Sequence, residues 1–176
     1  QRQMCIRDRL INDKVMGVML PKLFVPIAEK TNQIVQLNLW EIEEACEAIK
    51  RCEEREADLN SIIVQISVKS FSKKNFVSQV KKILDKHGIA PDRFCFDINE
   101  SILEAVKDQV MENIMAFREM GLKVSINDFG LEYTSLTHLA HYDVDYIGLH
   151  KSLLDGIMTS EKVQNTVQLS LIHISE

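Results

Sequence analysis

The stretch RFCFDINESILEAVKDQVMENIMAFREMGLKVSIND, residues 93–128, contains one strand–helix–strand unit. Its two ends, residues 93–99 and 122–128, are short apolar runs of the kind that form buried strands. Between them, apolar residues recur at helical spacing, and Gly121 marks the end of that helix. The apolar residues of the helix are Leu103, Val106, Val110, Ile114 and Phe117. The unit predicts two parallel strands joined by a helical crossover.

The same pattern continues on both sides of this unit. A helix with one apolar face is expected over residues 34–52, followed by a strand over 61–68 and a second helix over 76–87. Beyond residue 128, we expect a short helix over 135–142 and a last strand over 144–149. Apolar strands that alternate with amphipathic helices predict a single α/β domain whose strands are parallel and neighbours in chain order.

The composition excludes several classes of protein. The 176 residues include 21 Lys and Arg and 26 Asp and Glu, a net charge of −5, which argues against a general DNA-binding surface because that needs a basic stripe. No apolar run reaches the roughly 18 residues of a membrane span. The four cysteines have no CxxC spacing, so we expect reduced thiols and a cytoplasmic location. They are Cys5, Cys46, Cys52 and Cys95.

Polar residues stand at the ends of the expected strands, where parallel β/α folds bind their ligands. They are Gln65, Ser67, Asp97, Asn99, Glu100, Asn127, Asp128 and His150. The carboxylates of Asp97, Glu100 and Asp128 could together hold a hard divalent cation. Alternatively, these groups only cap the helices that follow, as Asn99 would do. The spacing alone leaves both possibilities open.

Four stretches resemble, in the same order, segments of EAL domains, the bacterial phosphodiesterases that linearise cyclic di-GMP. GVMLPKLFVPIAE (17–29) is similar to the family's G-x-I-x-P-x-x-F-I-P-x-A-E segment. DINES (97–101) resembles E-I-T-E-S, and SINDFGLEYTSL (125–136) resembles A-I-D-D-F-G-T-G-Y-S-S-L. DYIGLH (145–150) resembles D-Y-I-K-I-D. The resemblance extends over about residues 12–168.

This resemblance implies a fold of the TIM type, a (β/α)8 barrel typically of about 250 residues. The chain would supply a fragment from the middle of that barrel, about four parallel strands with flanking helices, as an EAL-like domain over residues 11–168. The strand with the Glu-Ala-Leu signature, before residue 12, and the last strands would be missing. Residues 1–10 and 168–176 resemble translated sequencing-adapter sequence, and we expect them to be non-native flanking segments.

The resemblance also assigns roles to individual residues. It implies metal-ligand positions at Gln65, Glu100, Asn127 and Asp128, and nucleotide-binding positions at Pro21 and Asp97. Active members have Asn in place of Gln65 and, in place of Asn127, an Asp that bridges two cations. Gly148 replaces a Lys that positions the attacking water, and His150 replaces an Asp. A neutral amide cannot clamp two cations, so we expect metal positions that are vestigial and no intact catalytic site.

Three hypotheses for function follow. The first is an EAL-like module of cyclic di-GMP signalling that is catalytically inactive, needs no metal, and binds the nucleotide or a protein partner. It would be attached to a sensory or diguanylate-cyclase domain. The second is an active phosphodiesterase specific for cyclic di-GMP that depends on Mg²⁺ or Mn²⁺. The third is an unrelated β/α-barrel enzyme with Glu100 as its base, for which the sequence shows no partner group.

Overall fold

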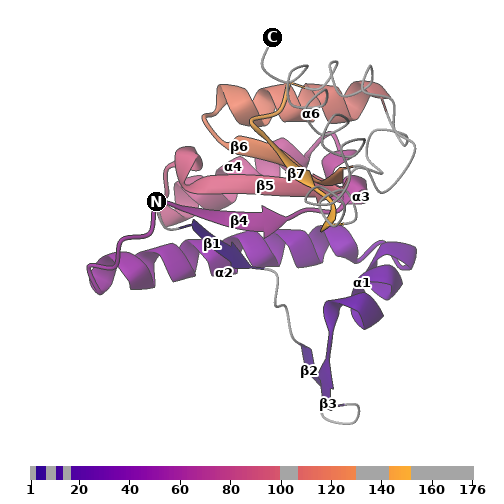
Figure 1. The fold of residues 1–176 in the computed structure, drawn as a ribbon, viewed down its shortest axis with the longest axis horizontal. Coiled ribbons are helices and arrows are strands. Elements are labelled where there is room, and N and C mark those ends of the chain that lie inside the picture. The colour runs from indigo at the N-terminus through magenta and orange to yellow at the C-terminus, as the bar shows by residue number, and fades with distance from the viewer. Residues whose placement is uncertain (1–2, 7–10, 14–16, 100–106, 130–142, 152–176) are drawn as a thin grey trace, which may run out of the picture.

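A computed structural model describes residues 3–6, 11–13, 17–99, 107–129 and 143–151 of the chain. Five strands form one sheet in the order β1-β4-β5-β6-β7, and every neighbouring pair is parallel (Figure 1). The strands are β1 (Gln3–Ile6), β4 (Ser61–Gln65), β5 (Phe94–Asn99), β6 (Lys123–Phe129) and β7 (Tyr146–Leu149). The predicted order and direction of the last four strands are confirmed.

Strand β1 was not predicted from the sequence. Its four residues, QMCI, are too few to show the alternation that identifies a strand, yet they pair in parallel with β4 from Gln3–Ser61 to Ile6–Val64. Backbone hydrogen bonds alone can add a strand to a sheet edge, whatever the side chains. The suggestion that residues 1–10 are a non-native flanking segment remains a prediction, and residues 3–6 nevertheless form a strand of the sheet. Their sequence does not contain Glu-Ala-Leu.

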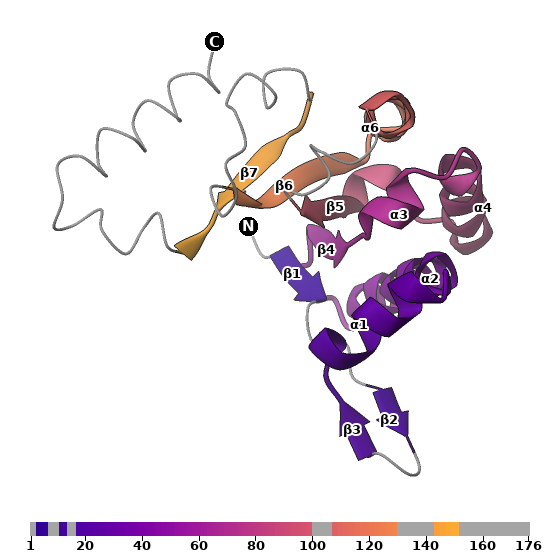
Figure 2. The ribbon, with the colours of Figure 1, turned by 90° about the vertical axis from the view of Figure 1, so that its right-hand side faces the viewer.

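Three long helices cover one face of the sheet, as Figure 2 shows. They are α2 (Ile34–Glu54), α4 (Phe76–His87) and α6 (Lys107–Glu119). Helix α4 ends where predicted, because Gly88 adopts the left-handed conformation with φ of 66° and closes the helix. The predicted short helix over residues 135–142 lies outside the described residues.

The remaining elements are short and connect or flank the strands and helices above. They are the antiparallel hairpin of β2 (Ile11–Asp13) and β3 (Gly17–Met19), helix α1 (Pro21–Lys30), helix α3 (Val68–Phe71) and the 3-10 turn η1 (Pro91–Arg93). The hairpin projects away from the sheet below α2 (Figure 1). The strand predicted over 61–68 stops at Gln65, because the side chain of Ser67 caps α3 instead.

Alternate residues of each strand build the hydrophobic core between sheet and helices. On β5, Phe94, Phe96 and Ile98 face the helices and are fully buried. Phe96 packs edge-on against Phe117 of α6, with ring centroids 5.1 Å apart, and against Phe71 of α3 at 6.3 Å. The intervening residues of β5 therefore face the opposite side of the sheet. Among the described residues, no helix has the length and apolarity to cross a membrane.

Candidate functional site

Polar side chains meet on the sheet face opposite the helices, at the carboxyl ends of three strands. Gln65 of β4 pairs in register with Asp97 of β5, and Asp97 pairs with Ser125 of β6. Two residues further along, Asn99 pairs with Asn127. Paired residues of parallel strands point to the same face, so this register brings together three predicted site residues, Gln65, Asp97 and Asn127. Of the other two acidic positions of the prediction, Asp128 follows Asn127 in β6, and Glu100 lies outside the described residues.

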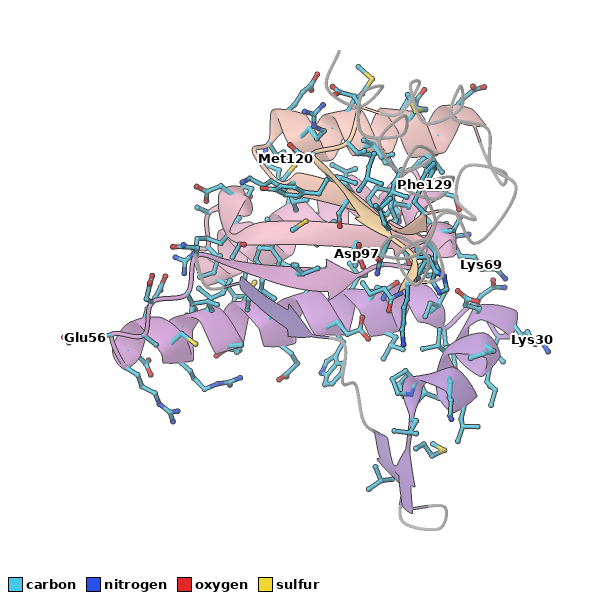
Figure 3. The ribbon with its side chains drawn as sticks, in the orientation of Figure 1. Lys30, Glu56, Lys69, Asp97, Met120 and Phe129 are labelled. Carbon is cyan, nitrogen blue, oxygen red and sulfur yellow. The ribbon has the colours of Figure 1, made fainter. Side chains whose placement is uncertain are left out.

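Asp97 is the centre of this polar cluster. Its side chain is buried, with 7% of the residue exposed. Oδ1 accepts a hydrogen bond of 2.6 Å from the Ser125 hydroxyl, and Oδ2 accepts one of 3.1 Å from Nδ2 of Asn127. Figure 3 shows Asp97 toward the end of the sheet where Phe129 and Lys69 also lie, with Glu56 at the far end. Hydrogen-bond donors on β6 thus contact both oxygens of the Asp97 carboxylate.

Asn127 and Asp128 lie in an irregular part of β6. The Asn127 side chain accepts a hydrogen bond at Oδ1 from the backbone N–H of Asp128, at 2.9 Å. Asp128 has a φ of 60°, the left-handed region that non-glycine residues seldom adopt. The register between β6 and β7 shifts between Ile126 and Phe129. Such irregularities re-aim side chains at functional sites, and here the bulge allows one carboxamide to contact both Asp97 and the next backbone amide.

Gly148 of β7 leaves the space that the Asn127 side chain occupies. A Cβ atom at position 148 would lie 2.6 Å from Oδ1 of Asn127 and 3.4 Å from its Cγ. Even an alanine there would force Asn127 to move. The resemblance identified Gly148 only as the loss of a lysine, because a contact between two strands cannot be read from one of them. At the end of β7, the backbone N–H of His150 donates to the carbonyl of Phe129 at 3.0 Å.

A cavity of about 370 Å³ opens beside Gln65, between α1, the first turns of α2 and the end of β4. Its apolar wall includes Pro21, Val25 and Pro26 of α1, and its polar wall includes Gln65 and Asn99. This volume is within the range of small-molecule sites. The structure therefore places Pro21 and Gln65 around one cavity, with Asp97 next to Gln65 in the sheet.

Asn38 of α2 supports the polar side of this cavity and is completely buried. Its Oδ1 accepts from the backbone N–H of Ser67 at 3.1 Å and from the Ser70 hydroxyl at 2.8 Å. Its Nδ2 donates to Oε2 of Glu41 at 2.8 Å and to the carbonyl of Gln65 at 3.4 Å. We did not predict this residue. The available signal is that Asn38 and Glu41 are polar residues three positions apart on the buried face of α2.

Helix α1 is held against the same loop by two hydrogen bonds. The Ser67 hydroxyl donates to Oε1 of Glu29 at 2.7 Å, and Nζ of Lys69 donates to the Glu29 carbonyl at 2.8 Å. Lys69 lies close to the last turn of α1, near Lys30, in Figure 3. These contacts fix the wall that carries Pro21 and Pro26 relative to the end of β4.

The described residues do not fit a pair of catalytic cations. Within the described ranges, no three His, Cys, Asp or Glu side chains converge as a metal-binding group. Gln65 and Asn127 are neutral amides, and the oxygens of Asp97 already accept hydrogen bonds from Ser125 and Asn127. Two-metal hydrolysis relies on carboxylates that clamp both ions, a donor set that this row of side chains lacks.

Cys95 lies on the same face of the sheet as Asp97, two residues earlier in β5. Its thiol is not reactive. Burial raises the pKa of the Cys95 thiol to about 11, and the negative charge of Asp97 adds to the increase, while the hydrogen bond with Ser125 opposes it. The group is therefore a neutral thiol at physiological pH. Within the described residues, Cys46, Cys52 and Cys95 are all free.

Comparisons with known proteins agree on one family. The sequence model of the EAL domain matches residues 9–174. The "Signaling protein YkoW" of Bacillus subtilis (strain 168) is 29% identical over 164 residues, which cover 89% of this chain and 20% of that protein. The "Bifunctional diguanylate cyclase/cyclic di-GMP phosphodiesterase MucR" of Pseudomonas aeruginosa is 29% identical over 142 residues, 80% of this chain and 21% of that protein. The chain thus spans about a fifth of these relatives.

Solved structures show the same fold. The "PaMucR Phosphodiesterase, c-di-GMP complex" matches with a TM-score of 0.79 at 24% identity, over 93% of this chain and 66% of that chain. The FimX EAL domain of Xanthomonas citri in complex with c-diGMP matches with a TM-score of 0.74 at 21% identity, over 85% and 58% of the two chains. The predicted TIM-type barrel architecture is confirmed.

Proposed function

The chain belongs to the EAL domain family, and from this premise we propose that it binds cyclic di-GMP without hydrolysing it. The cavity beside Gln65 would take the nucleotide, and the cluster around Asp97 would lie where hydrolysis occurs in active members. The MucR and FimX structures described above are complexes with this nucleotide. Their identity to this chain supports a common fold, and the transfer of the ligand is our proposal.

The observation that carries the absence of hydrolysis is the hydrogen bond from the Asn127 amide to Asp97. The resemblance implies a bridging carboxylate at this position. In this chain the side chain is neutral: its nitrogen donates to Asp97, and its oxygen already accepts from the backbone N–H of Asp128. Without the bridging charge, a second cation lacks the ligand that would hold it for generating hydroxide and stabilising phosphoryl charge. We infer that no catalytic site is intact.

The cavity wall supports nucleotide binding. Pro21, Val25 and Pro26 offer apolar surface for the flat face of a guanine base, and the amides of Gln65 and Asn99 can hydrogen-bond to its edge. Lys22 also lines the cavity and supplies a positive charge for a phosphate. We propose Pro21 and Asp97 as nucleotide-binding residues, as the resemblance implies, and add Gln65 because it lines the cavity. The vestigial metal positions are Gln65, Glu100, Asn127 and Asp128.

We further propose that the domain acts within a longer signalling protein, attached to a sensory or diguanylate-cyclase domain or bound to a protein partner. The supporting fact is that the chain spans about a fifth of YkoW and MucR, and that the printed name of MucR combines a cyclase with a phosphodiesterase. The free thiols of Cys46, Cys52 and Cys95 suit a reducing compartment, and we place the protein in the cytoplasm.

The rival function is a phosphodiesterase that depends on Mg²⁺ or Mn²⁺. Two observations favour it: the buried carboxylate of Asp97 lies at the centre of the cluster, and Asp128 is also acidic. For this function Gln65 and Asn127 would have to act as neutral ligands, and Asp97 would have to exchange its hydrogen bonds for a cation.

Titration calorimetry of the full-length protein with cyclic di-GMP tests the binding proposal. Gln65→Glu places a negative charge in the cavity, and we expect it to raise the Kd for the anionic nucleotide at least about tenfold. Gln36→Glu is the matched control, because it makes the same change at an exposed position of α2 outside the cavity. The control should stay within about twofold of the wild type. Equal effects of the two variants, or no binding by the wild type, would contradict the proposal.

A further inference from the structure

We infer that Asn127 and Gly148 form a neutral lock on Asp97, so that this buried carboxylate needs no divalent cation as its partner. As a consequence, the fold and the nucleotide-binding state are independent of divalent metal. The part that concerns nucleotide binding rests on the proposed function above. The part that concerns folding stands on the contacts of Asp97, Asn127 and Gly148 alone.

The carboxamide of Asn127 makes hydrogen bonds that a carboxylate cannot make. Asn127 donates from Nδ2 to Asp97 and accepts at Oδ1 from the backbone of Asp128. A carboxylate of the same shape can accept the second bond but cannot donate the first. Aspartate at position 127 would therefore leave two carboxylate oxygens facing each other across the present 3.1 Å contact. Two such groups cannot both stay ionised at that distance unless a cation lies between them, and without a cation one of them takes up a proton.

Asp97 is buried and needs partners for both of its oxygens. A carboxylate with 7% exposure is costly unless its oxygens are hydrogen-bonded or paired with a positive charge. The Ser125 hydroxyl and the Asn127 amide provide these hydrogen bonds, one to each oxygen. Two neutral groups of the same chain thus contribute to holding Asp97 in its buried position.

Gly148 leaves room for the Asn127 side chain. A Cβ at this position would overlap Oδ1 of Asn127 at 2.6 Å, and the flexible end of the Asn127 side chain is what would move. Because Oδ1 and Nδ2 belong to one rigid amide, this movement also breaks the contact with Asp97. Gly148 is therefore a positioning residue: its missing side chain keeps the donor of Asn127 on the carboxylate.

The test is thermal unfolding of the full-length protein in EDTA and in Mn²⁺. We expect the wild-type Tm to be the same in both, within about 1 °C. Asn127→Asp should lower the Tm in EDTA by at least about 3 °C, and Mn²⁺ should restore at least half of the loss. Gly148→Ala should lower the Tm equally in both solutions. Asn60→Asp, the same change at an exposed position before β4, should resemble the wild type.

Either of two results would overturn the lock. One is a wild-type Tm that rises in Mn²⁺ as much as that of Asn127→Asp, and the other is an Asn127→Asp variant as stable as the wild type in EDTA. If Asn127→Asp is too unstable to purify without metal but folds when Mn²⁺ is present throughout expression and purification, the lock is supported.

Nucleotide binding gives a second, separate readout. Calorimetry with cyclic di-GMP should give wild-type Kd values in EDTA and in Mn²⁺ that agree within about twofold. Binding that requires Mn²⁺ would contradict the metal-independent state while leaving the proposed ligand intact. No binding in either solution would contradict the proposed function, and the Tm comparison would still decide on the lock.

Discussion

The two faces of the parallel sheet are built by different kinds of interaction, although the same strands supply both. On the helix-covered face, Phe94, Phe96 and Ile98 of β5 are buried among other apolar side chains. On the opposite face, Asp97 of the same strand is held by directed hydrogen bonds from Ser125 and Asn127. The first face depends on volume and shape, whereas the second depends on which atoms donate and which accept.

This difference sets how each face responds to substitution. Conservative changes of apolar residues in a core are tolerated when the volume is kept. On the polar face, the exchange of one nitrogen for one oxygen at Asn127 would turn a hydrogen bond into a repulsion. We therefore expect the proposed function to depend most on the polar face, where isosteric changes matter most.

Removing an aromatic ring from the helix-covered face should have the largest effect. Phe96→Ala deletes contacts with the rings of Phe71, Phe94 and Phe117, whose centroids are within 6.3 Å. We expect a loss of about 3–5 kcal/mol in the free energy of unfolding, measured by chemical denaturation. Phe96→Leu, which keeps much of the volume, is the control and should lose clearly less. A loss below about 1 kcal/mol for Phe96→Ala would contradict the proposed core.

High pH should lower the free energy of unfolding because two buried cysteines, one on each side of the sheet, ionise only in the unfolded chain. Burial is the main cause that raises the pKa of Cys46, on the core side, and of Cys95, on the polar side, from 9.0 to about 11. Below pH 9 both thiols are neutral in the folded and in the unfolded chain. As the pH rises from 9 to 11, only the unfolded chain ionises, so each thiol should remove up to about 2.7 kcal/mol of stability.

Unfolding experiments at pH 8 and pH 10 check this loss. Cys46→Ala and Cys95→Ala should each show a smaller difference in stability between the two pH values than the wild type. If both variants lose as much stability as the wild type, the thiols are not the titrating groups.

Asn38→Ala should have a smaller effect that extends to the cavity. The variant leaves the N–H of Ser67 and the hydroxyl of Ser70 without their buried acceptor, which we expect to cost about 2 kcal/mol of stability. Because Ser67 also holds Glu29 of α1, the cavity wall should shift and cyclic di-GMP should bind more weakly. Denaturation and calorimetry measure the two effects. Unchanged nucleotide affinity with reduced stability would show that Asn38 does not shape the cavity.

The smallest effect is expected at the outer surface of the helices. Nζ of Lys86 lies 2.8 Å from Oε1 of Glu43, but their side chains are 65% and 39% exposed. The pair lowers the pKa of Glu43 and raises that of Lys86, chiefly through their hydrogen bond. Solvent screens such pairs, so Lys86→Ala should leave the Tm unchanged within about 1 °C. A clearly larger decrease in the Tm would show that this surface contributes more to stability than expected.

The apolar face could be predicted from the sequence because its signals are local. Alternation and helical spacing located β5, β6 and α4 to within one residue at most ends, and Gly88 marked the end of α4. The errors also have local causes. The prediction continued β4 to residue 68 because the cap formed by Ser67 was not recognised, and it missed β1 because four residues carry no period.

The polar face could be predicted only in part. The sequence indicated the edge where Gln65, Asp97 and Asn127 lie, because ligands of parallel β/α folds bind at the carboxyl ends of the strands. Applying this rule does not require the strand register. The central position of Asp97 depends on the register of three strands, and the role of Gly148 depends on a contact between two of them. Neither relation is encoded in the spacing along the chain. The roles that the resemblance implies for Glu100 and Asp128 remain predictions.

The most direct test of the central claim is whether the protein hydrolyses cyclic di-GMP. The full-length protein would be incubated with the nucleotide and Mg²⁺ or Mn²⁺, and the linear dinucleotide would be quantified by chromatography. We expect no metal-dependent product above the background without enzyme, because the neutral Asn127 occupies Asp97 in place of a bridging carboxylate. Turnover at about 1 s⁻¹ or faster, a rate typical of enzymes, would contradict this and establish the active phosphodiesterase.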